Sequence, residues 1–186
     1  MLAIPTQCAP QVAPETIVAI VRVESRGDPL AVHDNTTGRS YRPANTGQAQ
    51  ALLEALLRAR HSVDAGLMQI DSSNFFRLHV TPRTVFIPCV NVAAGGAILQ
   101  AAWTQAARAG MAGQAALWAA VQAYNSGNLR GAPSYASSVW AAAGQKARRG
   151  SSLEPTAQEA AVAPAFAAPG VSFSHAWTSA VTWKPT

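Results

Sequence analysis

The chain has 186 residues, of which 49% are hydrophobic and 12% charged, and it carries a formal net charge of +5. This length is enough for one domain with a hydrophobic core and some additional chain. The composition excludes a disordered polyelectrolyte, and the lack of about 18 consecutive apolar residues argues against a membrane-spanning helix. Residues 1–5 (MLAIP) are too few for a secretory signal and carry no basic residue, so we expect a removed signal or another export route.

The positive charge suggests an anionic polymer as partner, which includes both nucleic acid and the bacterial cell wall. The one dense basic cluster is residues 146–149 (KARR), and no aromatic residues are interleaved with it. Basic residues interleaved with aromatic ones are typical of nucleic-acid binding. We therefore expect no nucleic-acid partner.

Helical periodicity dominates the chain up to about residue 144. Pro14 and Glu15 suit a first helical turn, whereas Gly27 and Pro29 end helices, so a helix is predicted between them. Helices are also predicted over residues 47–61, 71–78, 82–85, 90–109, 113–125 and 133–143. Residues 34–46 are polar and rich in turn formers, and they form either a hairpin or an irregular loop. The prediction is a mainly helical domain with at most a small β element.

The composition changes beyond residue 144 to Ala, Pro, Ser and Gly. Such a segment cannot bury enough apolar surface to offset its ordering entropy. We predict one folded domain over residues 1–144 and a flexible tail over 145–186, with Trp177 and Trp183 as an adhesive end.

One face of the first predicted helix carries three apolar residues and then a carboxylate, at the spacing i, i+3, i+4, i+7: Ile17, Ile20, Val21 and Glu24. A carboxylate at the end of an apolar stripe has to be paired or desolvated. Desolvation raises the pKa of a carboxyl group, which then can donate a proton near neutral pH, as a general acid does. The alternative is a surface Glu24 paired with a neighbouring arginine.

Residues 66–70 (GLMQI) place a glycine before an apolar run that contains one amide. Gly66 permits close backbone approach to a ligand, and Gln69 can bond sugar hydroxyls and acetamide groups. The alternative is a loop that enters the core.

The helix predicted over 113–125 also ends its apolar face with a polar group. Leu117, Val121 and Tyr124 follow the spacing i, i+4, i+7, and a buried phenol needs a hydrogen-bond partner. Gly95 and Gly96 would let the helix over 90–109 pack closely against its neighbours.

The histidines and cysteines indicate no metal centre. The four histidines show no ligand spacing: His33, His61, His79 and His175. Cys8 and Cys89 form either a disulfide, which suits an oxidising compartment, or two buried thiols.

Four segments occur in order along the chain: Glu24-Ser25, residues 66–70, the glycine-containing helix from Asn91, and residues 123–127 (AYNSG). Together they resemble the lytic transglycosylases of the soluble-lysozyme-like superfamily, and most of all the single-domain members of type IV secretion and conjugation systems. The resemblance covers residues 8–143. It implies a mainly α, α+β lysozyme-like fold.

The resemblance implies a role for each motif residue. Glu24 would be the catalytic acid and then the base, and Tyr124 would hydrogen-bond and orient it. Ser25 would position the scissile sugar or the Glu24 carboxyl, and Asn125 would lie close to the substrate.

It also implies that Gly66, Met68 and Gln69 would lie along the glycan-binding groove. The two cysteines resemble a pair found in this subgroup, which favours a disulfide between Cys8 and Cys89.

The implied reaction needs one carboxylate, where most glycosidases need two. Neutral Glu24 would protonate the oxygen of the β-1,4 bond between N-acetylmuramic acid and N-acetylglucosamine, while the substrate's N-acetyl group shields the developing charge. Glu24 would then remove the proton of the C6 hydroxyl, which closes a 1,6-anhydro ring. No metal or cofactor is implied.

Asp71 departs from the family pattern, in which asparagine is expected after residues 66–70. We interpret it as a helix N-cap that serves Ser73 or Asn74. The alternative is a second carboxylate that activates water and makes the enzyme a hydrolase. Asp28 and Asp64 are weaker candidates for this second carboxylate and are interpreted as loop residues.

We therefore expect a monomeric periplasmic enzyme that opens the wall for a secretion apparatus and contacts its components through the tail. Deleting residues 145–186 is expected to leave glycan cleavage intact. The alternatives are a muramidase, or a catalytically silent glycan-binding assembly module, against which the joint presence of Glu24, Gln69 and Tyr124 argues.

Overall fold

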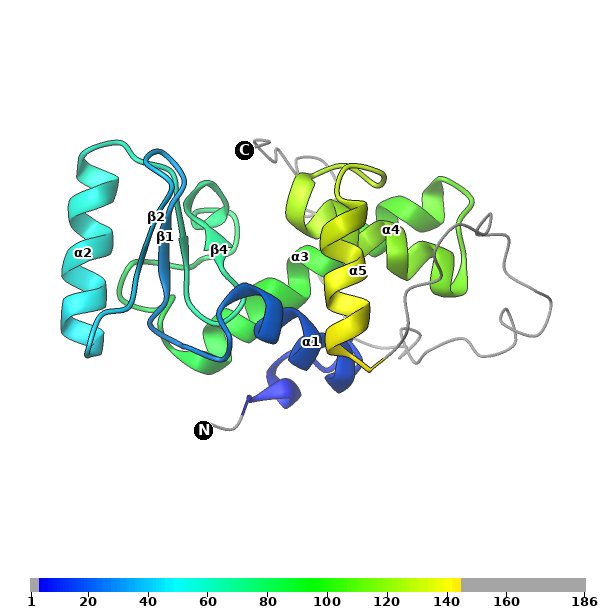
Figure 1. Ribbon diagram of the computed structural model, residues 1–186, viewed down its shortest axis with the longest axis horizontal. Coiled ribbons are helices and arrows are strands. Elements are labelled where there is room, and N and C mark those ends of the chain that lie inside the picture. Colours follow the sequence, from blue (N-terminus) through cyan, green and yellow to red (C-terminus); the bar gives the residue numbers. More distant parts are fainter. Residues whose placement is uncertain (1–3, 145–186) are drawn as a thin grey trace. The chain divides into compact units, whose positions relative to one another are not determined.

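The computed structural model describes residues 4–144 of the chain (Figure 1). Its elements, in chain order, are η1 (Thr6–Cys8), α1 (Pro14–Glu24), β1 (Val32–Asp34), β2 (Arg39–Tyr41), α2 (Thr46–Arg58), β3 (Val63–Ala65), β4 (Ile70–Asp71), η2 (Ser72–Asn74), α3 (Pro88–Arg108), α4 (Gly113–Ser126) and α5 (Pro133–Ala142). The predicted tail, including Trp177, Trp183 and the basic cluster, lies outside the described residues.

The mainly helical prediction with a small β element is confirmed. Of the two short predicted helices, the one over 71–78 is reduced to η2, and the one over 82–85 is wrong because residues 82–86 form turns. A single turn closes there through the Val85 N–H and the Thr81 carbonyl, at 2.9 Å. The Val85 carbonyl accepts a side-chain hydrogen bond from Asn91 instead of continuing a helix.

The described chain divides into two compact units. The first contains the described residues up to 9 together with residues 17–95. The second contains residues 10–16 and those from 96 onward.

The first unit contains a four-stranded antiparallel sheet with the order β2-β1-β3-β4. Of the two alternatives for residues 34–46, the hairpin is confirmed, because β1 pairs with β2 and Asp34 lies opposite Arg39. Adjacent residues of a strand point to opposite faces. Val32 and Asp34 are accordingly buried, and His33 between them is only partly buried.

The core of the first unit joins this sheet to helices. Its fully buried side chains include Ile17 and Ile20 of α1, Leu53 of α2, Val32 of β1 and Val63 of β3. Helix α2 packs on β1 and β3, and Figure 1 shows it running beside the strands. Asn45 caps α2, because its side chain accepts a hydrogen bond from the Gln48 N–H at 2.9 Å.

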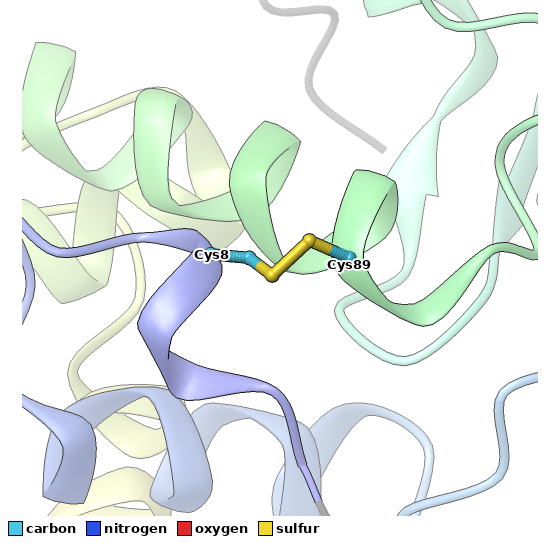
Figure 2. The surroundings of a disulfide bond; sticks show 2 residues. All are labelled: Cys8 and Cys89. Atoms are coloured by element: carbon cyan, nitrogen blue, oxygen red, sulfur yellow. A yellow bond between two sulfur atoms is a disulfide. The ribbon is translucent and has the colours of Figure 1, made fainter.

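A disulfide joins Cys8 to Cys89 within the first unit, as the family resemblance implied. The two residues are 81 positions apart in sequence. Figure 2 shows the bond linking the short N-terminal helical turn to the first turn of α3. No free cysteine is left in the chain, since these are its two cysteines.

The second unit is helical within the described residues, and α4 packs on α5. Trp118 of α4 meets Trp140 of α5 edge to face, with ring centroids 5.0 Å apart. Gly127, at φ +70°, ends α4 in the left-handed region that glycine adopts without strain. No helix within residues 4–144 is long and apolar enough to cross a bilayer.

Candidate functional site

Glu24 is the last residue of α1 and follows a fully buried stripe. Ile17, Ile20 and Val21 are 0% exposed, as the periodicity predicts, whereas Glu24 is partly exposed. The buried stripe of the helix therefore ends in an ionisable side chain near the surface.

Ser25 connects this end of α1 to the segment 66–70. Its Oγ lies 2.8 Å from the Leu67 carbonyl oxygen and 3.2 Å from that of Val21, and the residue is 2% exposed. The two sequence motifs, far apart in the chain, are therefore in contact. The Ser25 hydroxyl is directed to the backbone and fixes the turn beside Glu24, and its expected role toward the sugar or the Glu24 carboxyl stays a prediction.

Gly66 permits the close approach of a side chain of the protein, that of Asn91. It has φ +82°, and a Cβ built there would lie 2.1 Å from Nδ2 of Asn91. That amide donates to the carbonyl oxygens of Ala65 and Val85, each at 2.9 Å, and its Oδ1 accepts from the Met68 N–H at 2.7 Å. Asn91 is 1% exposed, so these hydrogen bonds are shielded from solvent and hold the backbone of the turn in place.

Met68 is 0% exposed, and its expected place along the glycan groove stays a prediction. Its side chain packs against Gly95 of α3, where an added Cβ would lie 2.5 Å from the Met68 sulfur. The close packing predicted for Gly95 is thereby confirmed. Met68 therefore packs the turn against α3.

Gln69 is partly exposed and has a left-handed backbone, with φ +45°. Its Nε2 donates to the carbonyl oxygens of Gly66 at 2.8 Å and Ala31 at 3.2 Å. These two bonds attach the Gln69 side chain to the backbone of the turn and of the segment before β1. Its expected contact with a sugar stays a prediction.

Asp71 is the N-cap of η2, as expected, and accepts a hydrogen bond from the Ser73 N–H at 2.7 Å. Its other carboxylate oxygen accepts from Ser62 Oγ at 3.2 Å. Asp28 is a loop residue that pairs with Arg42 at 3.0 Å, also as expected.

Asp64 is not a loop residue, which is a correction. It lies on β3, directly opposite Asp71 of β4. Burial raises the pKa of Asp64 to about 7, and the charge of Asp71 and a hydrogen bond with it act in the same direction, while a hydrogen bond with Asn35 opposes them. Sequence reasoning leaves Asp64 only a weaker candidate for a second carboxylate, because a strand of three residues is too short to show an alternating pattern.

A buried carboxylate at the end of β1 connects this strand to the turn that follows it and to His61. Asp34 is 1% exposed and accepts hydrogen bonds from Thr37 Oγ1 at 2.6 Å and from His61 Nδ1 at 2.9 Å. Burial by itself would raise the pKa of Asp34, but these bonds and one from the Thr36 N–H outweigh it and lower the pKa to about 2.

Tyr124 and Asn125 belong to the second unit, on α4. Tyr124 is 3% exposed, as expected for a phenol at the end of an apolar face, and Asn125 is exposed. Glu24 belongs to the first unit, so the predicted contact between Tyr124 and Glu24 stays a prediction. Among residues 4–144 no group of three or more His, Cys, Asp or Glu residues is arranged to hold a metal ion.

The chain matches the family model described as the transglycosylase SLT domain over residues 1–141. It therefore belongs to this family of transglycosylase domains, which confirms the resemblance seen in its motifs. A search among solved structures gives no significant match.

Two proteins that are similar to this chain are named virB1. Protein virB1 of Agrobacterium fabrum is 45% identical over 123 residues, which cover 66% of this chain and 50% of that protein. Type IV secretion system protein virB1 of Brucella abortus is 34% identical over 152 residues, which cover 76% of this chain and 63% of that protein. The chain thus spans about half the length of the first of these relatives.

Proposed function

We propose that the protein is a peptidoglycan lytic transglycosylase that cleaves the β-1,4 bond between N-acetylmuramic acid and N-acetylglucosamine. The observation that carries the proposal is the placement of Glu24. It ends the buried stripe of α1, and its neighbour Ser25 bonds to Leu67 in the turn over residues 66–70. Membership of the SLT family supports the same reaction.

In this reaction Glu24 protonates the glycosidic oxygen as the bond to C1 of the muramic sugar breaks. The carboxylate then takes the proton of the C6 hydroxyl, whose oxygen bonds to C1 and closes the 1,6-anhydro ring. Tyr124 orients Glu24, and Gln69 and Asn125 bind the sugars. No water enters the product, so one carboxylate suffices.

The similarity to type IV secretion proteins supports a role in opening the wall for a secretion apparatus. Such a role places the enzyme in the periplasm, where a disulfide such as Cys8–Cys89 is stable. Secretion components are the proposed protein partners.

The test is mass spectrometry of the muropeptides released from purified peptidoglycan by the wild type and by Glu24→Gln. We expect anhydro-muramic products from the wild type and a loss of rate of at least about 100-fold in the variant, because acid–base catalysis contributes about 10²–10⁴-fold. Glu54→Gln, an exposed position on α2, is the matched control and should keep full activity.

Two other outcomes would assign a different function. Products one water heavier would identify a hydrolase, and the partly exposed pair Asp64 and Asp71 would then be the candidates for activating water. An absence of products from every folded variant, with glycan still bound, would identify a binding module.

A further inference from the structure

The hairpin of β3 and β4 carries residues 66–69 in its loop and two carboxyl groups at its base. Asp64 and Asp71 are register partners in this antiparallel pair and share a hydrogen bond. Like charges directly opposite each other destabilise paired strands. The hydrogen bond between two carboxyl groups also requires a proton on one of them. The closed base therefore holds one proton.

Asp71 is the member of the pair that accepts hydrogen bonds from outside it. Its carboxylate accepts from the Ser73 N–H at 2.7 Å and from Ser62 Oγ at 3.2 Å. Asp64 is more enclosed, and burial raises its pKa to about 7. The shared proton therefore resides on Asp64 at and below neutral pH.

The other ionisable groups around Asp64 are few. His33 of β1 lies opposite Asp64 in register, and its Nδ1 is 2.8 Å from Ser40 Oγ. Helix η2 carries no ionisable side chain. Helix α2 adds Glu54 and Arg58, and the segment between α2 and β3 adds Arg60 and His61, the second of which pairs with Asp34 of β1.

The loop of this hairpin is the part of the first unit that meets the end of α1. Ser25 bonds to Leu67, and Asn91 bonds to the Met68 N–H and the Ala65 carbonyl. These bonds do not titrate, and they tie Leu67 and Met68 to α1 and α3 at every pH. Gln69, by contrast, directly precedes β4, so its position follows the pairing of β4 with β3.

We propose that Asp64 is a positioning residue whose proton, shared with Asp71, keeps the base of the hairpin closed and so holds residues 66–69 in register with the end of α1. The link to glycan cleavage rests on the proposed function. As the pH rises through about 7, the proton is lost, the two carboxylates repel, and the positioning of Gln69 is relaxed. Cleavage falls with rising pH for this reason.

The test follows two signals between pH 5.5 and 8.5 in the full-length protein. The first is the rate of muropeptide release. The second is amide hydrogen exchange of residues 63–71, corrected for the intrinsic effect of pH. In the wild type we expect exchange in the hairpin to accelerate by about tenfold, which corresponds to about 1.4 kcal/mol, and cleavage to fall over the same interval.

Asp64→Asn removes the titratable proton but keeps a hydrogen-bond donor opposite Asp71. Its amide can donate to the Asp71 carboxylate at every pH, so we expect both the acceleration of exchange and the alkaline fall in cleavage to disappear. Asp71→Asn removes the repulsion while keeping an oxygen for the cap of η2, and it serves if Asp64→Asn does not fold. His33→Gln is the matched control and should keep both transitions.

Persistence of both transitions in Asp64→Asn and Asp71→Asn would overturn the proposal, and so would their loss in His33→Gln. Hydrogen exchange decides this inference without reference to cleavage. A wild type that releases no muropeptides but shows the exchange transition would count against the proposed function alone.

Discussion

Asn91 does more for the candidate site than its sequence context indicates. Three backbone groups at positions 65, 68 and 85 meet its one buried amide. Its partners are 6 to 26 positions away in the chain, so no local pattern could have predicted them. The motif beginning at Asn91 was visible in the sequence, but the job of this residue was not.

We expect Asn91→Ala to lower the free energy of unfolding by about 2–4 kcal/mol. The substitution leaves buried carbonyl and N–H groups without partners, at about 1–3 kcal/mol each and less than additively. Urea unfolding of the variant measures the effect. Asn128→Ala is the matched control, since its side chain accepts a single exposed bond from the Arg130 N–H, and it should cost about 1 kcal/mol or less. Equal losses in the two variants would contradict this account.

Asp34 makes the protein sensitive to acid. Its pKa is lowered to about 2, below the 3.8 of the unfolded chain, so the unfolded state takes up the proton first as the pH falls. The stabilisation by Asp34 is thus present above pH 3.8 and is lost as the pH falls toward 2. Urea unfolding between pH 5 and 2.5 should show a steeper loss of stability in the wild type than in Asp34→Asn. Asp28→Asn should behave like the wild type, and a slope unchanged by Asp34→Asn would refute this role.

Among the elements, the long helices could be predicted and the sheet could not. The apolar stripe of α1 and the helical periodicity of the later segments are local signals, and they predicted these helices to within a few residues. The strands have only two or three residues each, and their pairing depends on contacts such as Asp34 with Thr37 and His61 that join separate segments. For the same reason Asp64 was interpreted as a loop residue.

The disulfide joins η1 to α3, two elements that are far apart in the sequence. Closing a loop of this length removes conformational freedom from the unfolded chain, and we expect a stabilisation of about 4 kcal/mol in the chain-entropy description. Thermal unfolding with and without reductant measures it. The double variant Cys8→Ser/Cys89→Ser should unfold at the lower temperature in both conditions. An unfolding temperature of the wild type that does not respond to full reduction would contradict the prediction.

For the molecule as a whole, the family could be read from four short motifs, and the roles of the motif residues stay predictions. What could not be read was the division of labour among them. Ser25 is expected to position the sugar or the Glu24 carboxyl, and its hydroxyl bonds to the backbone, while Met68, expected along the groove, is fully buried. Motif residues report what a site requires, and only packing shows which of them face the ligand.

The Cys8–Cys89 bond also turns residues 8–89 into a covalent ring, and Glu24 and residues 66–70 both lie on it. A protease that cuts one peptide bond in the exposed turn between β1 and β2 opens this ring without separating its ends. The nicked protein therefore migrates as a single species in a non-reducing gel and as two fragments once the bond is reduced. The halves of the candidate site in the first unit thus stay tethered after a cut that would divide a reduced chain.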